Sequence, residues 1–299
     1  MKKTALPIVL ALAGFATAVP AAHVQDLGFA QYKGYDVPYV PTPPEVVDAM
    51  LGLAAVKTGD VLYDLGCGDG RIVIAAAKKY GIKATGIDID PVRISESNQN
   101  AAEAGLTGKV RFIQGDIFQA DFKDATVVTM YLLTSVNLRL RPKLLAELKP
   151  GTRLVSHSFE MGEWLPDKTI AVTTNFGDER DVHFWLVPAN VTGRWTWDIG
   201  EGDGRKHYVL EAEQIFQVVT ASGREGNWPL ALSDIKLAGD AISFKADAEA
   251  DGKMVSELYE GRVSGDTITG TVRPAGNTKA APVAWKALRD PKSVTPIAK

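Results

Sequence analysis

The sequence predicts an α/β fold: a Rossmann-like, doubly wound sheet with a terminal antiparallel hairpin, followed by a C-terminal all-β domain that is either a barrel or a sandwich. Helix and strand signals alternate from about residue 42 to residue 188, as in a parallel sheet covered by helices. An apolar run typical of a strand buried on both faces leads into a turn with three alternate glycines, DLGCGDGRI (Asp64–Ile72). Beyond about residue 193 helix patterns vanish, and short β-like runs separated by turn signals follow.

Composition describes a soluble globular protein that is long enough for two domains. The chain has 299 residues, of which 45% are hydrophobic and 23% charged, and its formal net charge is -3. That charge argues against a large basic surface for nucleic acid, so no nucleic-acid partner is expected. The four histidines are scattered and no metal-ligand spacing occurs, so no metal site is predicted. Cys67 is the only cysteine, which excludes an internal disulfide.

The N-terminus has the layout of a secretory signal peptide. Lys2 and Lys3 precede a short apolar run, Ala5–Ala22, that ends in small residues. The run is short for a membrane span, which needs about 20 apolar residues. We therefore expect a signal peptide over residues 1–22, a periplasmic or secreted protein, and no stable membrane span after cleavage. An uncleaved N-terminal anchor is the alternative.

The first elements carry recognisable start and stop signals. In TPPE (Thr42–Glu45), Thr42 is predicted to cap a helix and Glu45 to complete a capping box. The strand before the glycines follows, and then a helix over 71–81 that ends at Gly81. A strand over 83–89 leads to a helix with Asp90 as its N-terminal cap.

The second half of the α/β region predicts three more parallel strands and a hairpin. A helix is expected over 136–151. The final two strand-like runs are joined by only four residues, 177–180, and a gap that short permits a hairpin and forbids a parallel crossover. The strands of this half are expected at 110–116, 125–133, 152–159, 169–176 and 181–188. We expect the α/β domain to cover residues 27–189.

The C-terminal domain is expected over residues 190–299. Its short runs and regular turn signals predict antiparallel strands. Trp195, Trp197 and Trp285 are predicted either to fill its core or to line a pocket.

The glycine turn lies where an open α/β sheet binds ligands, outside the carboxyl ends of its strands. Gly66, Gly68 and Gly70 permit a sharp turn and a close approach of ligand to backbone. A nicotinamide-binding G-x-G-x-x-G pattern counted from Gly66 would need its third glycine at position 71, which is Arg71. The spacing therefore disfavours a nucleotide-dependent oxidoreductase.

Two carboxylates follow at the ends of the next strands. Asp88 comes 22 residues after Gly66, where it can accept hydrogen bonds from ribose hydroxyls. Asp116 ends the third strand, and Ile117 beside it can pack on a base. This ordered set, over 39–188, resembles class I (seven-strand) S-adenosylmethionine-dependent methyltransferases. The pattern is nearest to seven-strand protein-lysine methyltransferases and uncharacterised bacterial relatives.

The resemblance implies S-adenosyl-L-methionine as cofactor. It implies that the amides of Gly66 and Gly68 hold the methionine end, that Asp88 holds the ribose, and that Asp116 holds the adenine. Tyr39, in a segment expected to close over the cofactor, and Thr42 would then lie near the methionine moiety. Ordinary structural explanations stay open. Asp88 and Asp116 can be turn residues, Asp64 can brace the glycine loop, and Thr42 can serve as a helix cap or pack against its neighbours. The residues expected at the cofactor are Thr42, Asp64, Gly66, Gly68, Gly70, Asp88, Asp116 and Ile117.

The end of the fourth strand faces the acceptor side in this architecture. Many amino-directed members carry Asn/Asp-Pro-Pro-aromatic there, whereas this chain has Tyr131 followed by two leucines. Tyr131 is the candidate catalytic residue, either orienting the acceptor or serving as a core aromatic. His157 is expected near the mouth as a structural histidine, and Glu160 and Trp164 are candidates for the acceptor side.

The methyl acceptor is expected to be a protein lysine or a small molecule. The alternative function is an exported, non-catalytic binding protein that uses its β domain to recognise a partner.

Overall fold

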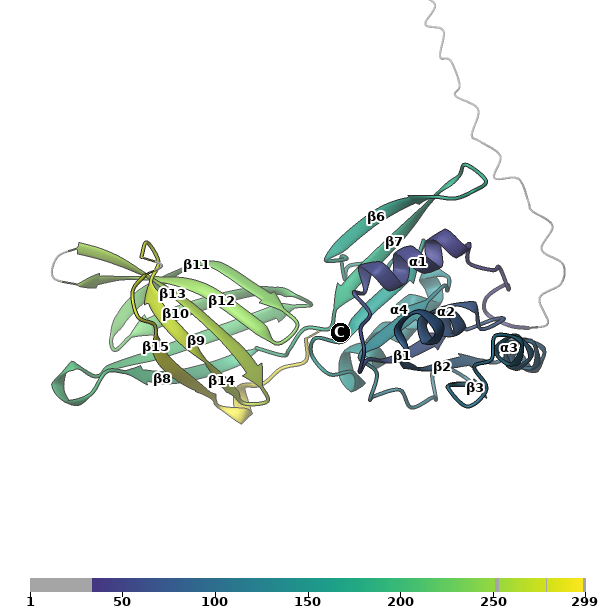
Figure 1. Ribbon diagram of the computed structural model, residues 1–299. Helices are drawn as coiled ribbons and strands as arrows, with labels where there is room; N and C mark the ends of the chain where they lie inside the picture. Colours follow the sequence, from purple (N-terminus) through teal and green to yellow (C-terminus); the bar gives the residue numbers. More distant parts are fainter. Residues whose placement is uncertain (1–33, 251–252, 278, 298–299) are drawn as a thin grey trace, which may run out of the picture. The chain divides into compact units, whose positions relative to one another are not determined.

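The computed structural model describes residues 34–250, 253–277 and 279–297. The predicted signal peptide lies outside the described residues. A seven-stranded sheet has the order β3-β2-β1-β4-β5-β7-β6 (Figure 1). Its strands are β1 Val61–Leu65, β2 Lys83–Asp88, β3 Val110–Gln114, β4 Val127–Met130, β5 Arg153–His157, β6 Lys168–Thr173 and β7 Glu179–Leu186. The helices are α1 Pro44–Leu53, α2 Arg71–Tyr80, α3 Pro91–Glu103 and α4 Thr134–Glu147.

Strands β1 to β5 are parallel, and β7 pairs antiparallel with both β5 and β6. Every residue of β4 is buried, as expected of a central strand. One hydrophobic cluster contains apolar residues of α1 and α2, and another contains those of α4. The predicted doubly wound sheet with a terminal hairpin is therefore confirmed.

Two of the three predicted helix caps have the expected chemistry. The Asp90 carboxylate accepts a hydrogen bond from the Val92 N–H at 2.8 Å, and α2 stops at Gly81, whose φ is +66°. The capping box at α1 is wrong: the cap residue is Pro43, which forms no side-chain cap. Thr42 lies one residue too early, and the Glu45 carboxylate instead accepts hydrogen bonds from Asn175.

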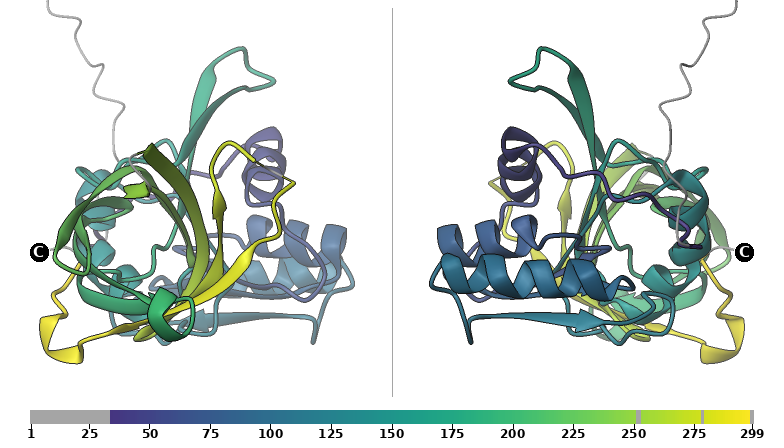
Figure 2. Two further views of the ribbon diagram at one scale, coloured as in Figure 1. Left: turned by 90° about the vertical axis from the view of Figure 1, so that its left-hand side faces the viewer. Right: turned by 90° about the vertical axis from the view of Figure 1, so that its right-hand side faces the viewer.

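The C-terminal strands form a closed eight-stranded antiparallel barrel (Figures 1 and 2). Its strands are β8 Gly193–Ile199, β9 Lys206–Ile215, β10 Val218–Glu225, β11 Trp228–Ala238, β12 Ala241–Ala250, β13 Lys253–Ser264, β14 Thr267–Pro274 and β15 Val283–Arg289. The sequence left barrel and sandwich open, and the pairing of β15 with β8 decides for a barrel.

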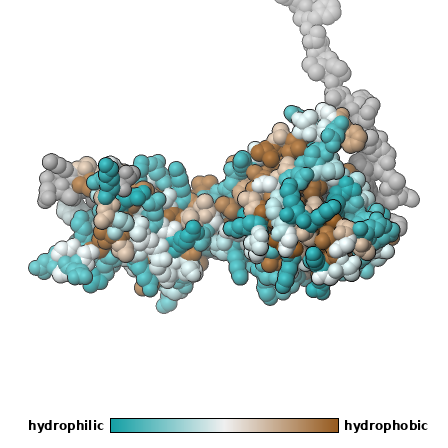
Figure 3. Space-filling model, in the orientation of Figure 1, coloured by the Kyte–Doolittle hydropathy of each residue, from teal (hydrophilic) through white to brown (hydrophobic). Residues whose placement is uncertain are grey.

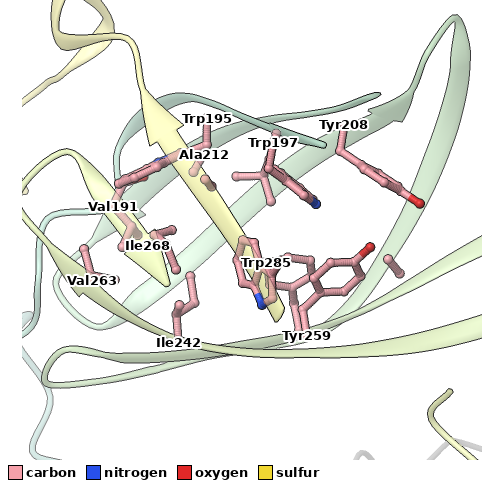
Figure 4. Packing of buried hydrophobic residues seen from close by; sticks show 14 of the residues in the cluster. Val191, Trp195, Trp197, Tyr208, Ala212, Ile242, Tyr259, Val263, Ile268 and Trp285 are labelled. Carbon is pink, nitrogen blue, oxygen red and sulfur yellow. The ribbon is translucent and has the colours of Figure 1, made fainter. Parts of the chain in front are cut away.

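Aromatic side chains fill the barrel (Figure 4). Trp195, Trp197 and Trp285 are at most 4% exposed. A barrel of eight strands has an interior that side chains can fill. The residual cavity is about 10 Å³, which is roughly the space of one water molecule. The three tryptophans are therefore core residues.

On the face seen in Figure 3, hydrophilic residues cover most of the surface and hydrophobic ones are scattered among them. None of the helices in the described ranges has the length and apolar character that crossing a bilayer requires.

Candidate active site

The strand registers bring four predicted residues into one row at the carboxyl edge of the sheet. Leu65 pairs with Ile87 and with Met130, and Met130 pairs with Ser156. One residue further along each strand, the row reads Asp88, Gly66, Tyr131, His157. The cofactor candidates and the acceptor candidates are thus neighbours at this edge.

The glycine turn needs glycine for its backbone and for its packing. Gly66, Gly68 and Gly70 have φ values of +76°, +54° and +79°, a region that side chains disfavour. A Cβ on Gly70 would lie 2.6 Å from Cζ of Phe112, and one on Gly66 would lie 2.7 Å from Cδ2 of Leu132. Protein side chains, as well as any ligand, therefore approach this backbone closely.

Two backbone amides of the glycine loop have hydrogen-bond partners within the protein. The Gly66 N–H donates to the carbonyl of Ile87 at 2.8 Å, and the Gly68 N–H donates to Oδ2 of Asp88 at 2.8 Å. Both groups thus have protein partners in this conformation, because the loop folds back onto the end of β2. The role of these two residues at the methionine end stays a prediction.

Asp88 joins two backbone segments. Its Oδ2 accepts from Gly68, and its Oδ1 accepts from the N–H of Asp90 at 2.9 Å. An ionised carboxylate has about four acceptor sites, so two bonds leave capacity for ribose hydroxyls. The ribose role stays a prediction.

Asp64 is a buried acid below the glycine loop. It is 2% exposed, and its Oδ1 accepts a hydrogen bond from the Thr129 hydroxyl at 2.7 Å. Burial raises the pKa of Asp64 to about 7, against the effect of the Thr129 bond, and the charges of Asp88 and Asp69 raise it further. Asp69 is already paired with Arg71, so Asp64 and Asp88 are the acids that favour a cation nearby, and the cofactor's sulfonium and amino groups are cations. The residues present therefore fit S-adenosylmethionine.

The segment before α1 covers the glycine loop. The Arg71 guanidinium donates to the carbonyl of Thr42 at 2.9 Å and pairs with the Asp69 carboxylate. The Tyr39 ring lies against Gly68, where a Cβ would meet Cε2 of the ring at 2.6 Å. The Arg93 guanidinium lies 4.4 Å from the centre of that ring.

Sequence reasoning missed Asp69, Arg71 and Arg93. The first two alternate with the glycines in DGR, and that charged pair within a ligand turn was the available signal. Nothing in the sequence links Arg93 to Tyr39.

At the end of β3, Asp116 forms a local turn. Its Oδ1 accepts from the N–H of Phe118 at 2.9 Å. Ile117 is partly buried against the cluster that contains α4. The adenine contact of these two residues stays a prediction.

On the acceptor side, Tyr131 stacks on His157 with ring centres 3.7 Å apart and 26° between the planes. His157 is 1% exposed, and its Nδ1 lies 3.3 Å from the Thr42 hydroxyl. Burial, and then the charge of Arg180, lower the pKa of His157 to about 4, so the ring is neutral at pH 7.

The two remaining acceptor candidates differ in their burial. Trp164 is fully buried and packs against Trp185 and Phe216, so it is a core residue rather than a lining residue. Glu160 is exposed. No group of three or more His, Cys, Asp or Glu side chains within the described ranges is arranged to hold a metal ion.

Comparison with known proteins connects this site to an enzyme family. A family model described as the ANTKMT methyltransferase domain matches residues 64–168. A protein-lysine N-methyltransferase of Saccharolobus islandicus is 53% identical over 137 residues, which are 46% of this chain and 85% of that protein. The mouse adenine nucleotide translocase lysine N-methyltransferase is 33% identical over 147 residues, which are 49% of this chain and 64% of that relative.

A solved structure is also similar: an RNA methyltransferase from Salinibacter ruber in complex with S-adenosyl-L-homocysteine. It shares 53% sequence identity over 51% of this chain and 96% of that chain, with a TM-score of 0.48.

Three observations indicate the same family: the sheet order, the glycine turn and the match over most of the Saccharolobus relative. The chain belongs to the class I S-adenosylmethionine-dependent methyltransferases, and S-adenosyl-L-methionine is its cofactor.

Proposed function

We propose that this methyltransferase transfers the methyl group to the side-chain amine of lysine in proteins. The observation that carries the proposal is the extent of the family match. Residues 64–168 include the glycine turn, Tyr131 and His157, so the similarity covers the acceptor side as well as the cofactor side. Two relatives named as lysine N-methyltransferases match 46% and 49% of the chain.

The chemistry asks the protein mainly for alignment. The cofactor supplies a methyl group made electrophilic by a positively charged sulfur. Asp64 and Asp88 favour that positive charge, and the row at the strand ends places Tyr131 next to Gly66. Holding two reactants in line is a large contribution to rate.

The acceptor amine must be neutral when it attacks. Its lone pair forms the new N–C bond while the C–S pair stays on sulfur, and the product ammonium then loses a proton to solvent. Burial raises the pKa of Tyr131, so its phenol stays protonated at neutral pH. We therefore assign Tyr131 the orientation of the amine rather than the removal of its proton.

The test uses the full chain, cofactor labelled in the methyl group, and whole-cell protein and RNA as separate acceptors. We expect label in protein, recovered as methylated lysine after acid hydrolysis. Asp88→Ala should label far less. Label in RNA, in arginine or in carboxyl esters would contradict lysine as acceptor. Absence of transfer at saturating cofactor would contradict the proposed function as a whole.

We also propose export, supported by Lys2, Lys3 and the apolar run up to Ala22. Cell fractionation and sequencing of the mature N-terminus test this proposal. Full-length protein retained in the cytoplasm would contradict it.

A further inference from the structure

The ring of Tyr131 stacks on two other aromatic rings. It stacks on His157 at 3.7 Å and on Phe159 at 5.9 Å between ring centres, the latter at 28°. We propose that His157 and Phe159 are positioning residues that fix the Tyr131 hydroxyl as the hydrogen-bond partner of the acceptor nitrogen. This inference rests on the proposed methyl transfer to an amine.

A strained turn presents Phe159. Ser158 has a φ of +60°, which is uncommon for a residue with a side chain. The Phe159 N–H donates to the carbonyl of His157 at 2.8 Å, and the Ser158 N–H donates to the carbonyl of Asp181 at 2.8 Å. Such strain costs about 1–3 kcal/mol and persists where the surroundings over-determine it, often at functional sites.

Buried polar side chains hold this turn from below. Asn137, which is 0% exposed, donates from Nδ2 to the carbonyls of Phe159 at 3.1 Å and Glu160 at 3.3 Å. The Ser156 hydroxyl donates to the same Phe159 carbonyl at 2.6 Å. A buried amide committed to a loop in this way fixes the loop's conformation.

The other ring is held from the cofactor side. His157 is the last residue of β5 and contacts the hydroxyl of Thr42, whose carbonyl accepts from Arg71 in the glycine turn. One chain of contacts therefore runs from the glycine loop to the Tyr131 ring. A shift of the glycine loop would therefore be transmitted to the Tyr131 ring on the acceptor side.

The hydroxyl of Tyr131 is left for a ligand. Tyr131 is half-buried, and no side chain in the described part of the chain hydrogen-bonds to its phenol. The charged groups that act on this ring are Arg180 and Asp178 of the hairpin. An amine whose N–H donates to the Tyr131 oxygen keeps its lone pair free, and a ring that cannot swing keeps that lone pair aimed.

The test is a double-mutant cycle on kcat, with cofactor affinity measured by titration calorimetry. Tyr131→Phe removes only the hydroxyl and should lower kcat about 10- to 100-fold, the range for a hydrogen bond to a charged group, because the acceptor nitrogen gains positive charge in the transition state. Phe159→Ala should lower kcat about three- to tenfold, the range for an aromatic pair. If Phe159 acts through Tyr131, its substitution in the Tyr131→Phe background should cost less than about twofold.

Two further variants separate positioning from folding. His157→Phe keeps a stacking ring but loses the contact with Thr42, so it should lower kcat clearly less than His157→Ala, which should lose about as much as Phe159→Ala. Tyr80→Ala is the matched control, because Tyr80 is also half-buried but ends α2, at the opposite end from the glycine turn. It should leave kcat and cofactor affinity unchanged.

Additive losses in the cycle, or equal damage by His157→Phe and His157→Ala, would overturn the inference. Loss of cofactor affinity in Phe159→Ala to the same extent as kcat would also overturn it. If the unaltered enzyme labels no amine, the proposed function fails and this inference fails with it. If it labels lysine but the losses are additive, only the positioning role fails.

Discussion

Asp64 shows how a single buried acid at this site couples charge to stability. It is almost fully buried, and its one hydrogen bond, from Thr129, does not offset the cost of ionising it there. A neighbouring cation would lower that cost. Ionisation of Asp64 and binding of a positively charged ligand should therefore favour one another.

We predict a pH dependence of stability that belongs to Asp64. Its folded-state pKa of about 7 lies above its ordinary value of 3.8, so the folded state binds the proton more tightly. The contribution of Asp64 to the free energy of unfolding should therefore fall as pH rises from about 4 to 7, by up to about 4 kcal/mol. The contribution of His157, whose pKa is lowered from 6.5 to about 4, rises over much of the same range. Denaturant unfolding of the unaltered protein and of Asp64→Asn at several pH values measures this contribution as the difference between the two slopes. An equal slope in both proteins would contradict the assignment.

Asp88 and Asp90 offer a second comparison between single residues. Asp88→Ala removes the acceptor of the Gly68 N–H and the candidate ribose ligand, so cofactor affinity should fall at least about tenfold. Asp90→Ala removes only the cap of α3 and should cost about 1 kcal/mol of stability. Titration calorimetry and thermal unfolding separate the two effects. Equal losses of affinity would mean that the ribose role is assigned to the wrong carboxylate.

Among the secondary-structure elements, α2 begins and ends on a glycine in the left-handed region, yet the two positions differ. Gly70 precedes the helix inside the site, where Phe112 and Ser97 occupy the space of a side chain. Gly81 follows the helix with no neighbour within 4 Å. Packing and backbone conformation both require glycine at position 70, whereas only backbone conformation requires it at position 81.

Alanine at the two ends of α2 should therefore have unequal effects. Gly81→Ala carries the left-handed penalty of about 1–2 kcal/mol. Gly70→Ala carries the same penalty together with overpacking, which adds about 1–3 kcal/mol. Thermal unfolding checks the stability, and cofactor binding should weaken in Gly70→Ala alone. A larger loss at Gly81 would refute the packing argument.

Across the full chain, one residue of the barrel belongs to the core of the α/β sheet. Phe216, in the turn between β9 and β10, is 5% exposed and stacks on Trp164 at 5.9 Å between ring centres. The Arg141 guanidinium of α4 lies 5.1 Å from the centre of its ring. The two sheets therefore share part of one hydrophobic cluster.

We predict that Phe216→Ala destabilises the methyltransferase sheet, although the residue comes from the barrel. Removing a buried phenylalanine typically costs about 3–5 kcal/mol. Denaturant unfolding followed by tryptophan fluorescence measures the loss. Phe176→Ala, at a position 91% exposed, is the control and should change stability little. A loss below about 1 kcal/mol at Phe216 would show that the contact contributes no net stability.

Local patterns in the chain were enough to predict the alternation of helices and strands, the hairpin after β5 and the glycine turn. They also placed Asp88 and Asp116 at strand ends, because these features follow from local backbone preference and from hydrophobic periodicity. Closure of the β domain into a barrel emerged only in three dimensions, since it depends on the pairing of the first and last strands of that domain. Folding also brought Thr42 against His157, 115 residues away, and turned the amides of the glycine loop onto the end of β2. Such contacts arise from packing between distant segments, and no local pattern records them.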